Sequence, residues 1–360
     1  MNNKLQVKNR IGWIDIAKAI GILVVLINHA ELHLGFVTFL GGMFYMPVFF
    51  VLSGYTFKNH SEESIRSFIM NKAKRLLVPY ACFQVVLIGL FTMINVIKRQ
   101  SVGQILYSIV GAVYSRNTLF AKASDTLVTV PTNTIDLMTG LSGPLWFLTA
   151  LFVTLVIYKF ILTVSNGSAK REWLYLGISI FIGIMFKYMC PILLPWSIDS
   201  AFVSVGFIHC GRMMKKENII QKLYRAPHYI LGIIAVFVVL SYINGIVNMS
   251  IRDFGKSVLI YLVVGSVGSL LVMLISKAIE EYTKIINQIL EMIGRHTIGI
   301  LAFHLIIFGI IQSVFVILQL SDGMIEKSIK IIASVVILVP TDWFIQKNLP
   351  FVYGIMRRSE

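Results

Sequence analysis

Apolar runs that recur along the whole chain are the feature that most restricts its fold. An α-helix needs about 20 mostly apolar residues to cross the hydrocarbon core of a bilayer. Of the 360 residues, 57% are hydrophobic and 14% are charged, whereas a soluble domain carries about 25% charged residues. So much apolar surface cannot be hidden inside one water-soluble globule of this length. The sequence therefore predicts a polytopic integral membrane protein.

Helices are the expected spanning elements, because lipid offers no water to satisfy backbone groups. We predict an all-α transmembrane bundle of about ten helices, at residues 13–34, 39–57, 79–97, 143–163, 173–190, 198–213, 227–247, 255–276, 296–318 and 328–346. The fifth and sixth flank CPILLPWSID, where Pro191, Pro195 and Asp199 indicate a tight re-entry. With no internal repeat and no separate soluble domain evident, residues 1–360 are expected to form one transmembrane domain.

Basic residues predict the orientation of the bundle. The chain has 32 Lys and Arg against 17 Asp and Glu, and the basic residues gather in short segments between apolar runs, such as 58–78, 212–225 and 277–295. Cytoplasmic loops carry the excess of Lys and Arg in membrane proteins, so both chain ends are expected in the cytoplasm. The interrupted pattern is that of topology signals, and no nucleic acid is expected as a partner.

The longest stretch outside the predicted spans is 98–142, expected on the outer side and rich in Ser, Thr and Asn. Two interpretations stay open. Long ordered loops are often functional, so this one could cap an outward-facing cavity, or it could be a disordered connector. The three cysteines, Cys82, Cys190 and Cys210, show no disulfide framework and no metal-ligand spacing, so no metal site is expected.

The first predicted span, RIGWIDIAKAIGILVVLINHAELH, carries three ionisable residues, Asp15, Lys18 and His29. Ionisable residues inside a membrane are costly and usually face the bundle interior or a wet cavity. Lys18 and His29 share a helix face to within about 20° and lie about 16 Å apart along the axis. Each has a structural alternative: His29 could bond a backbone carbonyl near the interface, and Lys18 could be a snorkelling anchor. Their common face favours a functional pair.

Further motifs follow in order along the chain. They are MPVFFVLSGYTF with Phe49, Phe50, Ser53, Gly54 and Tyr55, KAKRLLVPY with Arg75 and Pro79, GPLWFLTALF at 143–152, and IGRHTIGILAFHLII with His304. Together with Asp15, Lys18 and His29, they resemble membrane acyltransferase family three, especially the branch similar to fucose 4-O-acetylases and other polysaccharide O-acetyltransferases. The chain departs from many members at Lys18, where they have Arg. A lysine is a point charge and cannot provide a planar bidentate contact.

The resemblance implies acyl transfer across a bacterial cell membrane. The donor would be cytoplasmic acetyl-coenzyme A, a cosubstrate rather than a tightly bound cofactor. The acceptor would be a hydroxyl of a cell-surface or lipid-linked glycan, as in exopolysaccharide biosynthesis, with membrane lipids as the surroundings. The candidate donor-binding residues are Asp15, Lys18, Ser53, Lys74 and Arg75, with Lys72 a further cation near the mouth.

His29 is then the expected general base, because imidazole is mostly neutral at cellular pH. Glu31 could orient its ring, but lies about 200° round a continuous helix, so that pairing requires the helix to end there. Trp146 and His304 are candidate acceptor-binding residues. Trp146 could instead be an interface anchor, Ser53 could serve helix packing, and His304 could bond another helix. His33 shares the His29 face, whereas His60, His228 and His296 are expected to be solvated.

Two other classes of function remain open at this point. A glycan or lipid transporter or flippase would also have many spans and a cavity, although no repeated halves are evident. An inactive relative that serves as an assembly partner is the third interpretation, and the presence of Lys18 and His29 argues against it.

Overall fold

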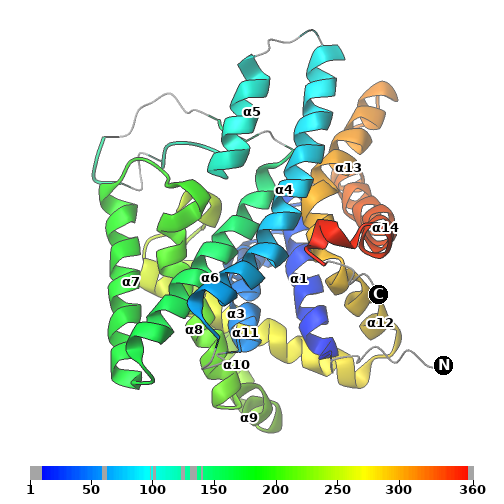
Figure 1. Cartoon of the computed structure of the whole chain (residues 1–360). Helices are drawn as coiled ribbons and strands as arrows, with labels where there is room; N and C mark the ends of the chain where they lie inside the picture. The colour runs from blue at the N-terminus through cyan, green and yellow to red at the C-terminus, as the bar shows by residue number, and fades with distance from the viewer. Residues whose placement is uncertain are drawn as a thin grey trace, which may run out of the picture.

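The computed structural model describes residues 10–58, 63–97, 99, 103–122, 126–129, 136–138 and 141–355. Within these ranges the regular elements are all helices, and β-pairing is limited to isolated bridges. The long helices lie side by side in one bundle (Figure 1). The predicted all-α membrane architecture is confirmed.

The helices in chain order are α1 (Gly12–His29), α2 (Phe36–Phe44), α3 (Pro47–Tyr55), α4 (Ile65–Ile97), α5 (Gly103–Tyr114), η2 (Gly143–Leu145), α6 (Trp146–Ser165), α7 (Ala169–Met189), η3 (Pro195–Ser197), α8 (Ile198–Lys216), α9 (Ile219–Arg225), α10 (His228–Asn244), η4 (Met249–Ile251), α11 (Val258–Tyr282), α12 (Ile285–Arg295), α13 (Thr297–Ile317), α14 (Met324–Asn348) and η5 (Pro350–Tyr353).

The number of spans differs from the predicted ten. In the described residues, seven helices are long and apolar enough to cross a membrane, and two bent pairs raise that number to nine. The expected span 198–213 became α8, which carries Asp199, His209 and Arg212 and is not among the nine. It packs against α3, α6 and α7, so neighbouring helices shield its polar groups from lipid.

The two ends of the described chain lie together. Arg10, before α1, and Ile355, after η5, line one cavity. The basic segments 212–225 and 277–295 end in α9 and α12. These two helices lie toward one end of the bundle, and α5 lies at the other (Figure 1).

The second predicted span, 39–57, is a broken helix. The axes of α2 and α3 meet at 42°, and the break falls at Tyr45 and Met46, immediately before Pro47. Proline has no N–H to continue the hydrogen-bond ladder of a preceding helix. Irregular backbone is tolerated at membrane depth where it borders a cavity, and both Tyr45 and Met46 line one.

The described parts of 98–142 are ordered. They include α5, and the strand-like segment after it pairs Thr118 with Asp136 and Phe120 with Ile192. The Ala121 N–H also donates to the Pro191 carbonyl at 2.9 Å. For these described residues, the pairings favour the cap interpretation over a disordered connector.

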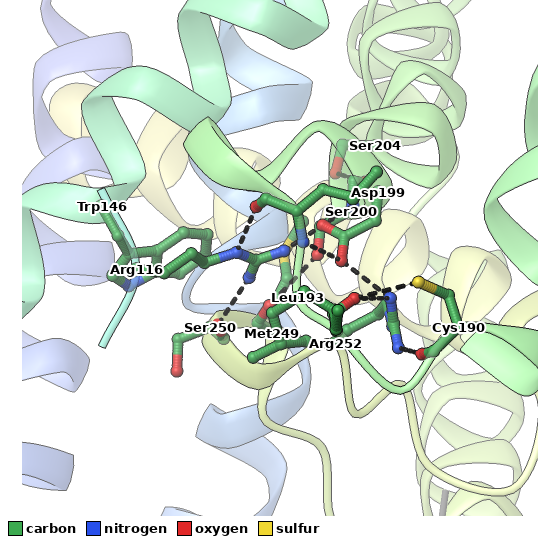
Figure 2. Close-up of polar contacts among 12 residues, drawn as sticks. Arg116, Trp146, Cys190, Leu193, Asp199, Ser200, Ser204, Met249, Ser250 and Arg252 are labelled. Atoms are coloured by element: carbon green, nitrogen blue, oxygen red, sulfur yellow. Dashed lines mark hydrogen bonds and ion pairs between the residues drawn. The ribbon is translucent and has the colours of Figure 1, made fainter. Parts of the chain in front are cut away.

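A buried ion cluster joins three of the loops at the α5 end. Arg116 and Arg252 converge on Asp199 (Figure 2), and at most 1% of any of these side chains is exposed. Arg252 Nη1 donates to Asp199 Oδ2 at 2.9 Å, while Arg116 donates to the other carboxylate oxygen. Arg116 also donates to the carbonyls of Leu194 at 3.0 Å and Ser250 at 2.7 Å. The cluster thus holds the chain just after α5, the start of α8 and the η4 loop together.

Replacing Asp199 by Ala should destabilise the folded bundle by about 3–5 kcal/mol, because two buried guanidinium groups lose their only carboxylate within the cluster. Thermal unfolding of the purified protein in detergent, followed by fluorescence, measures the effect. The matched control is Lys122→Ala, which removes a cation that is 57% exposed and 3.8 Å from Asp253, a surface pair worth about 1 kcal/mol or less. Equal melting temperatures for the two variants would contradict the role assigned to the cluster.

Candidate functional site

Two adjoining cavities run through the middle of the bundle. The His29 cavity has a volume of about 950 Å³ and also contains Asn28 and Trp146 in its wall. The Lys18 cavity has a volume of about 470 Å³ and also contains Ser53 and Arg75. Three buried residues, Val25, Met46 and Leu301, line both cavities. We call these three the dividing residues. The common helix face predicted for Lys18 and His29 thus opens onto two neighbouring spaces.

The Lys18 cavity is strongly cationic. Four basic residues, Arg10, Lys18, Arg75 and Arg295, belong to its lining, and no acidic residue does among the described residues. The rest of the wall is mainly apolar and includes Phe49, Leu52, Phe147 and Leu151. Such a space suits a ligand with an anionic head and a less polar arm.

Asp15 organises these cations from behind the wall. Its side chain is 3% exposed and accepts from Arg10 Nε at 2.5 Å and from Lys18 Nζ at 3.1 Å. Arg295 Nε lies 3.9 Å from the same carboxylate and pairs with Glu291 at 2.6 Å. Asp15 is therefore placed to position Lys18 and Arg10, and it does not itself line the cavity.

Arg295 reaches this cluster because α12 packs very closely on α1. A Cβ atom at Gly294 would lie 1.8 Å from the Asp15 carbonyl oxygen, so only glycine permits the approach. Sequence reasoning missed both Arg295 and Arg10 as site residues. The signal was present in the motifs, since Arg10 opens RIGWID and Arg295 lies within IGRHTIG.

The predicted donor residues separate in the structure. Lys18, Ser53 and Arg75 line the Lys18 cavity, whereas Lys74 is exposed on α4 and lies outside the lining. Arg75 stands four residues before Pro79, whose missing N–H leaves the Arg75 carbonyl without its helical donor. The close helix packing considered for Ser53 is found at the neighbouring Gly54. A Cβ atom there would lie 2.0 Å from the Ile208 carbonyl oxygen.

The His29 cavity is lined by many groups that can hydrogen-bond a ligand. Its polar members are Asn28, Glu31, Ser108, Asn117, Lys122, Asp136, Asn248, Ser250 and Asp253, and many of them come from the ordered loops at the α5 end. The loop 98–142 thus contributes to the wall, which supports the cap interpretation. Trp146 is 6% exposed and packs edge-on against Phe147. It is part of this wall rather than an interface anchor.

His29 is the last residue of α1, and its ring is exposed in the cavity. Its Nδ1 lies 2.7 Å from Nε2 of His304 on α13. His304 is fully buried, and its Nδ1 faces the carbonyl oxygens of Ile300 at 2.9 Å and Leu301 at 3.1 Å. His304 therefore bonds another helix, which was the structural alternative for this residue. Its partner on that helix is His29.

Glu31 does not orient the His29 ring. The helix ends before it, as that pairing required, and Glu31 has the left-handed φ of 53°. This conformation costs a non-glycine residue about 1–2 kcal/mol. Glu31 lines the cavity, but the ring partner of His29 is His304, and the Glu31 carbonyl accepts from Lys327 at 3.0 Å.

The prediction that His296 is solvated is wrong. It is 7% exposed, and its Nδ1 lies 2.7 Å from Asp342 Oδ2. Gln346 donates to the same oxygen at 2.6 Å, and the Tyr353 hydroxyl donates to the other. Burial and the Asp342 carboxylate raise the pKa of Tyr353, so the phenol stays protonated and donates. This cluster fixes η5 beside the Lys18 cavity. Asp342 lies within the predicted span 328–346, where, as with Asp15, an ionisable residue is costly and is expected to face the bundle interior.

The remaining histidines lie away from this centre. His33 is exposed and lines a smaller cavity of about 380 Å³ with Glu31 and Thr38. His228 is exposed at the start of α10, as predicted, and His60 is outside the described residues. Among the residues that the structure describes, no group of three or more His, Cys, Asp or Glu could hold a metal ion.

Comparison with known proteins identifies one family. The family model described as "Acyltransferase domain" matches residues 11–343. This range contains the helices from α1 to α13, which include Lys18, His29 and His304. No curated protein and no solved structure matches the chain.

The two cavities should be reached from opposite sides of the membrane. With Cys82, Cys190 and Cys210 replaced by Ser, a charged membrane-impermeant thiol reagent should label Ser53→Cys from the side that carries the chain ends. It should label Lys122→Cys from the other side, because Lys122 lines the His29 cavity. Right-side-out and inside-out vesicles provide the two conditions. Labelling of both variants from one side would overturn this arrangement.

Proposed function

The chain belongs to membrane acyltransferase family three, whose model matches residues 11–343, and on this basis we propose that it is an O-acetyltransferase. It transfers acetyl from cytoplasmic acetyl-coenzyme A to a glycan hydroxyl. The acceptor is a cell-surface or lipid-linked glycan, and the membrane is a bacterial cytoplasmic membrane. The observation that carries the proposal is that Lys18 and His29, on one face of α1, line two adjoining cavities.

The donor occupies the Lys18 cavity. Coenzyme A carries several phosphates, and the cations of Arg10, Lys18, Arg75 and Arg295 match that charge. Arginine binds phosphate in a bidentate manner, whereas lysine acts as a point charge. The apolar part of the wall accommodates the pantetheine arm. Lys18 and His29 are about 16 Å apart along α1, a distance that an extended pantetheine arm covers.

The arm has to pass the dividing residues to bring its thioester to His29. Val25 lies one turn before His29, and Leu301 lies on α13 near His304. Met46 stands at the break between α2 and α3, and its unbranched side chain adapts to a changing space. In the absence of the arm, these apolar side chains separate the two cavities and limit the passage of ions.

The acceptor sugar occupies the His29 cavity. Asn28, Asn117, Asn248 and Ser250 offer donors and acceptors for sugar hydroxyls, and Trp146 offers an aromatic surface. His29 removes the proton from one hydroxyl while its oxygen attacks the thioester carbonyl carbon. The carbon–sulfur bond breaks, and the thiolate of coenzyme A takes the proton back from the imidazolium. The products are an acetyl ester and free coenzyme A, with no acyl-enzyme required.

The direct test uses membranes that contain the protein, acetyl-coenzyme A labelled in its acetyl group, and the glycans of the producing cell. Label should appear on glycan, and mass spectrometry of surface glycans should show that an acetyl group is lost when the protein is removed. Movement of glycan across the membrane without transfer of label would instead indicate a transporter.

Replacing His29 by Ala should leave the protein folded and inserted but reduce acetyl transfer by about 10²-fold or more, the usual contribution of a positioned general base. Label incorporation per amount of inserted protein measures this effect. The control is His228→Ala, which removes an exposed histidine far along the chain. Normal transfer by the His29 variant would remove this residue from the mechanism.

Replacing Lys18 by Ala should raise the KM for acetyl-coenzyme A by about tenfold or more, since a hydrogen bond to a charged group contributes about 1.5–3 kcal/mol. Lys18→Arg should have a smaller effect, because the cation is kept. The exposed Lys222 on α9 provides the matched control as Lys222→Ala. Donor titrations that are the same for the Ala and Arg variants would count against a phosphate contact.

A further inference from the structure

We propose that His304 is a positioning residue that sets the tautomer of His29 and so decides which nitrogen of His29 acts as the base. The inference rests on the proposed function, because it concerns the base of that reaction. It assigns to His304 the positioning of the His29 base rather than contact with the acceptor sugar.

His304 forms the buried end of the pair. His304 Nδ1 faces two backbone carbonyl oxygens of its own helix, those of Ile300 at 2.9 Å and Leu301 at 3.1 Å. A carbonyl oxygen only accepts hydrogen bonds, so the proton of the ring has to be on Nδ1. A neutral imidazole carries one N–H. His304 Nε2 therefore presents a lone pair.

That lone pair is directed at His29. His304 Nε2 is 2.7 Å from His29 Nδ1, the planes of the two rings differ by 8°, and their centroids are 5.0 Å apart. Two rings in face-to-face contact cannot bring nitrogens this close, so the rings meet edge to edge, in the geometry of an N–H···N hydrogen bond. The proton of this bond belongs to His29 Nδ1, because His304 Nε2 has none.

The consequence is that His29 Nε2 is the basic atom. It is on the far side of the ring from His304, and no described residue hydrogen-bonds to it. The ring of His29 is exposed in the His29 cavity, while His304 is fully buried. The base is thus held in one tautomer with its lone pair toward the acceptor.

The same bond assists the reaction after proton transfer. When His29 Nε2 takes the hydroxyl proton, the ring becomes an imidazolium whose Nδ1–H still donates to His304 Nε2. His304 stays neutral and keeps its own proton toward the carbonyls. In proteins, the hydrogen bond made by one imidazole nitrogen often determines the state of the other. Here the partner is a second histidine, and its own state is fixed by the backbone of α13.

The test combines two substitutions with a spectroscopic measurement on the full-length protein in lipid. His304→Leu removes the acceptor, and His304→Gln keeps an amide oxygen that can accept from His29 Nδ1. We expect His304→Leu to lower kcat by about tenfold or more, a part of the roughly 10²–10⁴-fold that a positioned general base contributes, with little change in either KM. His304→Gln should recover most of that loss. His228→Leu is the control.

Nitrogen-15 NMR of labelled histidine, with the His29 signals assigned through His29→Ala, reads the tautomer directly. The wild-type protein should have its proton on His29 Nδ1, and His304→Leu should give a mixture. A proton on Nε2 in the wild type would overturn the inference even if the variants fail to fold. A wild-type kcat in His304→Leu, with His29→Ala inactive, would also overturn the inference. The proposed function would be unaffected by that result. Full activity of His29→Ala would instead remove the base itself, and this inference with it.

Discussion

The cost of placing charge and hydrogen-bonding groups in hydrocarbon governs this structure. A bilayer provides no partners for such groups, so a chain that carries them across must enclose them among its own helices. The single face of α1 that holds Lys18 and His29 meets this requirement, because neighbouring helices surround it and leave two cavities there. Asp15 at the cationic end and His304 at the other give these side chains buried partners.

The same constraint explains the irregular parts of the bundle. The break between α2 and α3 and the left-handed Glu31 both border cavities rather than lipid. Polar residues lower the hydropathy of α8 below that expected of a span, and the helices packed around α8 cover them. The ion cluster of Arg116, Asp199 and Arg252 then secures the loops over the His29 cavity.

Much of the fold was predictable from sequence, because each helix that crosses lipid needs a long apolar run. Nine of the ten predicted segments correspond to candidate spans or bent pairs, and the common face of Lys18 and His29 follows from helix geometry alone. What sequence reasoning missed depends on contacts between distant segments. The approach of Gly294 to Asp15, which brings Arg295 to the site, links positions on α12 and α1. The His29–His304 bond likewise joins α1 to α13, and no spacing along the chain indicates it. Pro47 in the second predicted span was visible in the sequence, but the 42° bend between α2 and α3 that precedes it was not predicted.

The central claim is that one chain brings a donor from one side of a membrane to an acceptor on the other. Proteoliposomes that enclose acetyl-coenzyme A and expose the glycan acceptor only to the outer solution test it most directly. The account predicts that acetyl ester forms on the outer glycan while the released coenzyme A stays inside the vesicles. Transfer that occurs only when donor and acceptor share one compartment, or no transfer in either arrangement, would contradict it.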